Sequence, residues 1–217
     1  MNVVDSFSWP FRGRWRSKWA VGLVAVLFLP VLFVIVLGYA IAATRQAEVD
    51  PSEGPPTWRL SRRLVTDGIW ATLAVLLASV PFIAVFNLLA GALFDARVWP
   101  SHDAGLAHFY ARVLALLILA LPWGIVLLVV MPHATATFAA GGRPRDMFDV
   151  VAAARGVRRD FATWNLAAAA IVTGWALGIA CVGLLCVGLV PGIFYAILVS
   201  AHASASLQRK GETPPAR

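Results

Sequence analysis

Between Asp160 and Arg209 this chain contains no Lys, Arg, Asp or Glu. Three shorter charge-free windows come before it: Lys18 to Arg45, Asp67 to Asp95, and Arg112 to Arg143. All four are dominated by Leu, Val, Ala, Ile and Phe. Because about 20 apolar residues cross the hydrocarbon core of a bilayer as a helix, each short window holds at most one span and the long window holds two. The chain is therefore predicted to be an integral membrane protein.

The windows are uninterrupted rather than alternating in hydropathy, which predicts membrane helices and not a β-barrel. Composition agrees, since 60% of the residues are hydrophobic and 13% are charged, whereas about a quarter are charged in a soluble globular protein. We expect an all-α fold, a polytopic transmembrane bundle of four or five spans. Residues 1–217 would form one integral membrane domain, with a basic, aromatic interfacial tail at 1–18 and a short cytoplasmic tail at 208–217.

Four spans can be placed from the windows: Gly68 to Leu93, Leu106 to Met131, Asn165 to Leu185, and Val187 to Leu207. Basic residues are concentrated in both tails and in the loops after the first and third windows, whereas residues 95–112 are poor in them. The positive-inside rule places basic flanks in the cytoplasm. We therefore expect the C-terminus to be cytoplasmic and residues 95–112 to face the other side.

The first window raises a problem of parity, because the segments on both its sides are basic. Pro30 lies near its middle, and proline breaks helices. Two half-helices around Pro30 would form a re-entrant segment that returns to the same side. The alternative is a full first span with the N-terminal tail translocated, and the charge pattern favours the re-entrant form. A cleaved signal peptide is disfavoured because the apolar region of a signal peptide has about 7 to 15 residues. The first window is much longer than that.

The sequence contains an internal repeat. Pro122 is followed after ten residues by His133 and a run of small residues, and Pro191 is followed in the same way by His202. In a weaker third copy, Pro30 is followed after eight residues by Tyr39 and then by residues 40–44. Basic loops after the copies indicate parallel repeats, which point in the same direction. The repeat predicts a bundle built from duplicated units.

Two amphipathic segments, at residues 146–164 and 58–67, follow copies of the repeat. We expect them to be interfacial helices in the plane of the lipid headgroups. Anionic headgroups on the cytoplasmic side are the expected partners, at roughly 1 kcal/mol per basic residue near the surface. Nucleic acid is not an expected partner, because the basic N-terminal tail joins an apolar window directly. The candidate lipid-facing basic residues are Arg12, Arg14, Arg16, Lys18, Arg155, Arg158 and Arg159.

His133 and His202 occupy equivalent positions at the ends of two spans. Two imidazoles are able to bind a metal or carry protons, but no carboxylate or thiol accompanies either histidine in sequence. We interpret them as polar caps at the membrane interface and expect neither a metal nor a cofactor.

Four glycines have the small-xxx-small spacing that lets helices approach closely. We expect them to pack within this chain, while a protein partner or a homo-oligomer stays open as the alternative. These glycines are Gly174, Gly178, Gly188 and Gly192.

Signatures of enzymes are missing: the sequence has no Walker loop, no His-Glu-x-x-His and no Gly-x-Ser-x-Gly. We therefore expect a non-enzymatic protein that organises lipids or partner proteins through its basic cytoplasmic face. The alternative is a small transporter or channel for a neutral or lipid-like solute, since the four apolar windows contain no charged residue.

A set of short motifs is similar to a known pattern. They are Trp9-Pro10-Phe11, Trp15, Lys18 and Gly22, then Gly38-Tyr39, Pro56-Thr57-Trp58 and Asp67-Gly68. In these motifs the chain resembles the prokaryotic multi-pass membrane family catalogued as domain of unknown function 4013, over nearly its whole length. Pro55, Arg59 and Leu60 depart from the usual residues of the family. The resemblance implies a multi-pass inner-membrane protein and brings no known activity or site residues.

Overall fold

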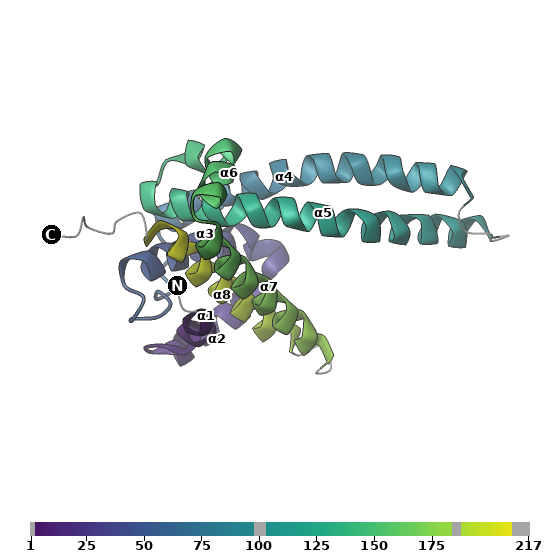
Figure 1. Cartoon of the computed structure of the whole chain (residues 1–217). Helices are drawn as coiled ribbons and strands as arrows, with labels where there is room; N and C mark the ends of the chain where they lie inside the picture. The colour runs from purple at the N-terminus through teal and green to yellow at the C-terminus, as the bar shows by residue number, and fades with distance from the viewer. Residues whose placement is uncertain (1–2, 98–102, 184–187, 210–217) are drawn as a thin grey trace. The chain divides into compact units, whose positions relative to one another are not determined.

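The computed structural model describes residues 3–97, 103–183 and 188–209, which form helices and connecting turns with no strand among them (Figure 1). The elements are α1 (Val3–Ser8), η1 (Trp9–Phe11), α2 (Trp15–Leu27), α3 (Leu29–Val49), α4 (Arg62–Asp95), α5 (Ala104–Gly141), η2 (Pro144–Met147), α6 (Val150–Arg159), α7 (Phe161–Ala180), η3 (Cys181–Gly183) and α8 (Leu189–Arg209). Helices α3, α4, α5, α7 and α8 are long and apolar enough to cross a membrane. The predicted all-α membrane fold is therefore confirmed.

The four placed spans fall on α4, α5, α7 and α8, although the predicted ends Leu185 and Val187 lie outside the described residues. The first window forms two helices, α2 and α3, that are separated at Phe28. The break comes two residues before Pro30, which lies in the first turn of α3. A proline is tolerated there because the N–H it lacks has no partner within the helix.

The contacts of the chain fall into two compact units, each of which is described by itself. The first unit comprises residues 1–72 and 130–217, and the second comprises residues 73–129. Both units contain parts of α4 and α5. The single membrane domain expected from the sequence stays a prediction.

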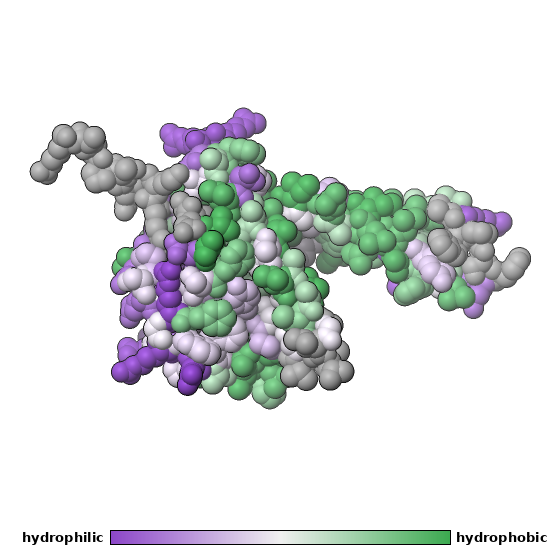
Figure 2. All heavy atoms as spheres, turned by 60° about the horizontal axis from the view of Figure 1, so that its bottom comes forward, coloured by the Kyte–Doolittle hydropathy of each residue, from purple (hydrophilic) through white to green (hydrophobic). Residues whose placement is uncertain are grey.

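The second unit is a hairpin of α4 and α5. The Phe82 and Trp123 rings lie 6.0 Å apart, and Phe94 stacks on His108 at 3.6 Å. Only 11% of the apolar window of α4 and 6% of that of α5 are buried, and apolar side chains cover the hairpin in Figure 2. Exposed apolar surface on this scale requires an apolar surrounding. The hairpin thus has the surface of a membrane-embedded element.

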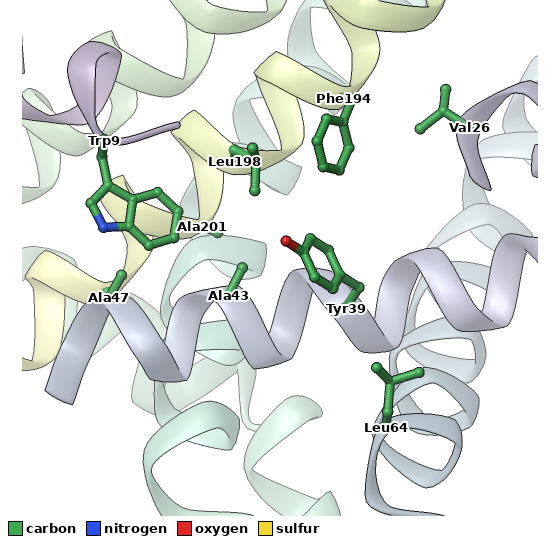
Figure 3. Close-up of a cluster of buried hydrophobic side chains, with 10 residues drawn as sticks. Trp9, Val26, Tyr39, Ala43, Ala47, Leu64, Phe194, Leu198 and Ala201 are labelled. Atoms are coloured by element: carbon green, nitrogen blue, oxygen red, sulfur yellow. The ribbon is translucent and has the colours of Figure 1, made fainter. Parts of the chain in front are cut away.

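The first unit is built around α8, which packs against α7, α3, α2 and α1. Phe194 and Leu198 of α8 are buried with Tyr39 of α3, and the rings of Phe194 and Tyr39 point toward one another, 6.1 Å apart (Figure 3). Trp9 of η1 joins the same cluster and has no exposed surface. Trp9 and Pro10 are thus buried in this unit, where Trp9 removes a large apolar area from water, while Phe11 is 45% exposed. The interfacial tail at residues 1–18 stays a prediction.

Candidate functional site

Hydrogen bonds join the basic segments of the first unit at one end. Arg12 Nη1 donates to the Pro51 carbonyl oxygen at 3.0 Å, and Arg45 Nε donates to the Ala139 carbonyl oxygen at 3.0 Å. Near the end of α8, Gln208 Nε2 donates to Thr137 Oγ1 at 3.0 Å. We call this region, which comprises residues 3–18, 45–67, 133–163 and 202–208, the charged end. Three basic segments and the end of α8 thus meet at one end of the first unit, the arrangement that a common side of the membrane requires.

The first window leaves the charged end and returns to it. At the start of α2, the Lys18 ammonium donates to the carbonyl oxygen of Pro55, which lies after the end of α3. Trp58 Nε1 donates to the Lys18 carbonyl oxygen at 3.0 Å. Because these bonds join the two flanks of the window, α2 and α3 have the hairpin geometry of the re-entrant interpretation. A tail on the opposite side from residues 51–61 is incompatible with them.

The same bonds correct the role of Lys18. Its side chain was expected to face lipid headgroups, yet Lys18 is only 7% exposed and its ammonium is used inside the protein. Arg12 is also engaged, since it forms an ion pair with Asp5 at 2.8 Å. Arg14 and Arg16 are exposed. The part of the N-terminal basic cluster that is presented to the surroundings therefore consists of Arg14 and Arg16.

The motif residues Tyr39 and Trp58 hold the loop after α3. Their rings stack at 3.7 Å with an interplanar angle of 2°, and Tyr39 Oη donates to the Pro56 carbonyl oxygen at 3.0 Å. Gly38 adjoins α4 so closely that a Cβ there would overlap the Leu64 carbonyl oxygen. These motif residues therefore serve to pack α3, the loop and α4 together.

The predicted amphipathic segment at 146–164 is not one helix. It comprises the end of η2, then α6, then the start of α7. Asp149 accepts a hydrogen bond from the Ala152 N–H at 2.7 Å and so caps α6, while Asp160 accepts from the Thr163 N–H at 3.1 Å and caps α7. An aspartate that caps one helix ends the run of the helix before it. The two aspartates were the sequence signal for this division. The apolar residues of 146–164 have helical spacing throughout, and this spacing predicted a single helix instead.

Helix α6 presents three different faces. Ala153 is buried and Gly156 lies against the His133 ring of α5, so this face docks on the bundle. Val150 and Val151 are 52% and 65% exposed. Arg155, Arg158 and Arg159 are all exposed. An apolar surface and a basic surface therefore lie side by side on a helix that the bundle holds in place.

The two histidines of the repeat pack against different short elements. His202 is 3% exposed, its Nδ1 lies 3.0 Å from Ser6 Oγ, and its ring lies 5.4 Å from that of Trp9. His133 instead packs against Gly156 of α6. Tyr39, which takes the place of the histidine in the third copy, packs against the loop that follows α3. In each copy the ring therefore secures a short segment at the charged end, and for His202 that segment is α1 and η1.

The structure does not bring the two histidines into one shared site. Within residues 3–97, 103–183 and 188–209, no group of three or more His, Cys, Asp or Glu is arranged to hold a metal ion.

The four glycines contribute to contacts within the chain. A Cβ on Gly178 or on Gly192 would overlap the carbonyl oxygen of the other, so α7 and α8 cross in direct backbone contact here. Gly174 lies against Val199 of α8, and Gly188 lies against the Cys181 carbonyl oxygen. The chain's own residues therefore lie against all four glycines.

A pocket of about 180 Å³, which we call the α3–α4 pocket, opens at the charged end. Its charged lining residues are Arg45, Arg59, Arg63 and Asp67. Arg45 and Asp67 form an ion pair at 3.0 Å, and Arg63 Nε lies 4.0 Å from the same carboxylate. The pocket was not predictable from the sequence because its residues belong to α3, the loop and α4. Arg63 and Asp67, four residues apart on a helix, were its only local signal.

A second hollow, of about 160 Å³, lies in the second unit. It is lined by Asn87, Ala90 and Gly91 of α4 and by His108 and Arg112 of α5. Arg112 marks the beginning of the third charge-free window, so this hollow lies toward the loop end of the hairpin.

The family model described as protein of unknown function (DUF4013) matches residues 21–190. The chain belongs to this family. The resemblance found in its motifs is therefore confirmed, and the chain is a helical membrane protein of the DUF4013 family. Comparison with curated proteins and with solved structures gave no match.

Proposed function

We propose that this DUF4013 protein is a non-enzymatic inner-membrane protein that binds anionic lipid headgroups through its charged end and thereby organises lipids or partner proteins. The observation that carries the proposal is α6, on which Arg155, Arg158 and Arg159 are exposed beside the exposed Val150 and Val151. The docking of Ala153 and Gly156 fixes the helix, so these side chains are presented without the cost of ordering a free segment.

The chemistry of α6 suits a headgroup layer. Valine side chains favour the boundary between headgroups and acyl chains, and arginines beside them reach lipid phosphates. A guanidinium binds phosphate through two parallel hydrogen bonds. At roughly 1 kcal/mol per basic residue, three arginines contribute about 3 kcal/mol, or a little over a hundredfold in affinity.

Orientation follows from the same charges. Anionic lipids give the cytoplasmic leaflet a negative surface potential, and the chain carries a formal net charge of +7. With the charged end cytoplasmic, α6, Arg14 and Arg16 all meet that leaflet, and the C-terminus follows α8 into the cytoplasm.

The test is native mass spectrometry of the full chain released from nanodiscs that contain equal amounts of phosphatidylglycerol and phosphatidylcholine. Wild type should retain phosphatidylglycerol preferentially, and the double variant Arg155→Gln/Arg158→Gln should retain roughly tenfold less or lower still. The matched control is Arg97→Gln/Arg112→Gln, which removes the same charge from the loop end of α4 and α5 and should leave retention unchanged.

Equal retention by the α6 variant and wild type would refute the proposal. So would saturable solute flux through the reconstituted protein that is abolished by substitutions lining one cavity, because that result would show a transporter instead.

A further inference from the structure

We propose that the α3–α4 pocket is a binding site for a phosphate monoester, the group that a phosphatidate headgroup shares with small soluble phosphate esters. This site is separate from α6 and does not depend on the function proposed above.

The charge of the pocket is unbalanced. Three arginines and one aspartate line it, which leaves a net charge of +2. Asp67 is 6% exposed and is already paired with Arg45, while Arg63 lies farther away at 4.0 Å. Arg59 makes no ion pair or hydrogen bond within the part of the chain that the structure describes. A phosphate monoester carries a charge of about −1.5 to −2 at neutral pH and is the complement of this lining.

The donors are presented from fixed backbone. Asp67 holds Arg45, whose Nε also donates to the Ala139 carbonyl oxygen, so Arg45 forms an ordered wall of the pocket. Ser61 accepts a hydrogen bond from the Leu64 N–H at 3.1 Å, which leaves its own O–H to donate. Arg59 and Arg63 are exposed at the opening and supply the planar forks that suit phosphate oxygens.

The size and place of the pocket select a headgroup rather than a whole lipid. A volume of about 180 Å³ is well above the roughly 10–15 Å³ that a single water molecule needs. That space accepts a phosphate group and leaves acyl chains outside. Arg45 ends the first charge-free window and Asp67 begins the second, so the pocket lies where apolar helices meet polar surroundings and is accessible to lipid and soluble esters alike.

The experiment uses the full chain in phosphatidylcholine nanodiscs. Calorimetry measures the binding of glycerol 3-phosphate, and native mass spectrometry measures the retention of phosphatidate against phosphatidylglycerol with the same acyl chains. The variants are Arg59→Gln and Arg63→Gln. The matched control is Arg62→Gln, since Arg62 is exposed next to Arg63 but does not line the pocket.

We expect phosphatidate, glycerol 3-phosphate or both to bind, with roughly tenfold weaker binding in each pocket variant and less than a twofold change in the control. Retention of phosphatidate without glycerol 3-phosphate binding would identify a lipid ligand. Binding of glycerol 3-phosphate with comparable affinity would identify a soluble one.

The inference is overturned if phosphatidylglycerol, a monoanionic diester, is retained to the same extent as phosphatidate. It is overturned too if neither phosphatidate nor glycerol 3-phosphate is bound. It is also overturned if Arg62→Gln weakens binding as much as Arg63→Gln, because the effect would then come from diffuse charge. Arg155→Gln/Arg158→Gln should lower phosphatidylglycerol retention and leave the preference for phosphatidate intact, so this site and the function of α6 fail independently.

Discussion

Replacement of Gly178 by alanine tests the backbone contact between α7 and α8 in the protein's first unit. A Cβ at this position would lie 2.5 Å from the Gly192 carbonyl oxygen, where ordinary contact begins at 3.4 Å. The difference, 3.4 − 2.5 = 0.9 Å, has to be met by moving α7 and α8 apart, because both partners are backbone. Overpacking of this kind costs about 1–3 kcal/mol, and the better helix propensity of alanine returns up to about 1 kcal/mol. We expect a net loss of about 1–2 kcal/mol.

Thermal unfolding in a mild detergent measures this loss. At about 2–4 °C per kcal/mol for a chain of this size, the midpoint should fall by roughly 2–8 °C. Gly192→Ala forces the same separation from the other helix, so the double variant should lose less than the sum of the single losses. The matched control is Gly124→Ala in α5, where a Cβ has no neighbour within 4 Å and the midpoint should stay the same or rise slightly.

Equal midpoints for Gly178→Ala and Gly124→Ala would refute the reasoning, because the cost comes entirely from the contact between α7 and α8. Additive losses in the double variant would refute the shared separation.

Arg45→Met leaves the Asp67 carboxylate, whose side chain is 9% exposed, without its nearest cation and should cost about 3 kcal/mol in thermal unfolding. Arg45→Met/Asp67→Leu should recover most of this loss, and a double variant as unstable as the single one would contradict a buried ion pair. Tyr39→Phe removes the bond to the Pro56 carbonyl oxygen and should cost about 1 kcal/mol; an unchanged midpoint would show that this bond does not contribute. In a cysteine-free background, a membrane-impermeant thiol reagent should label Ser52→Cys from the same side as Arg14→Cys and Asp103→Cys from the other; opposite sides for the first two would exclude the α2–α3 hairpin.

The spans were predictable because charge is expensive in lipid, which makes the limits of each window readable from the sequence. Asp67 and Asp95 delimit a window that coincides closely with α4, whose bounds are Arg62–Asp95. Pro30 predicted a break in the first window, and the two helices are separated two residues before it, at Phe28. Local rules of this kind were sufficient for the helices of the membrane fold.

Long-range packing was not predictable from the same rules. The basic and aromatic residues of the N-terminal segment are as compatible with a membrane surface as with a protein core, and only the tertiary contacts distinguish these fates for Trp9 and Lys18. The α3–α4 pocket gathers Arg45, Arg59 and Arg63 from three segments. No window or spacing in the sequence indicates that the three guanidinium groups meet.

The contact between Ser6 and His202 forms only late in the synthesis of the chain. The two residues are 196 positions apart, and at about 5–20 residues per second the ribosome needs roughly 10–40 s to make that length. During this delay Trp9 has no α8 to bury its ring, although α2 and α3 have already been synthesised. Trp9 is thus synthesised well before α8 and reaches its native place only once α8 has been made.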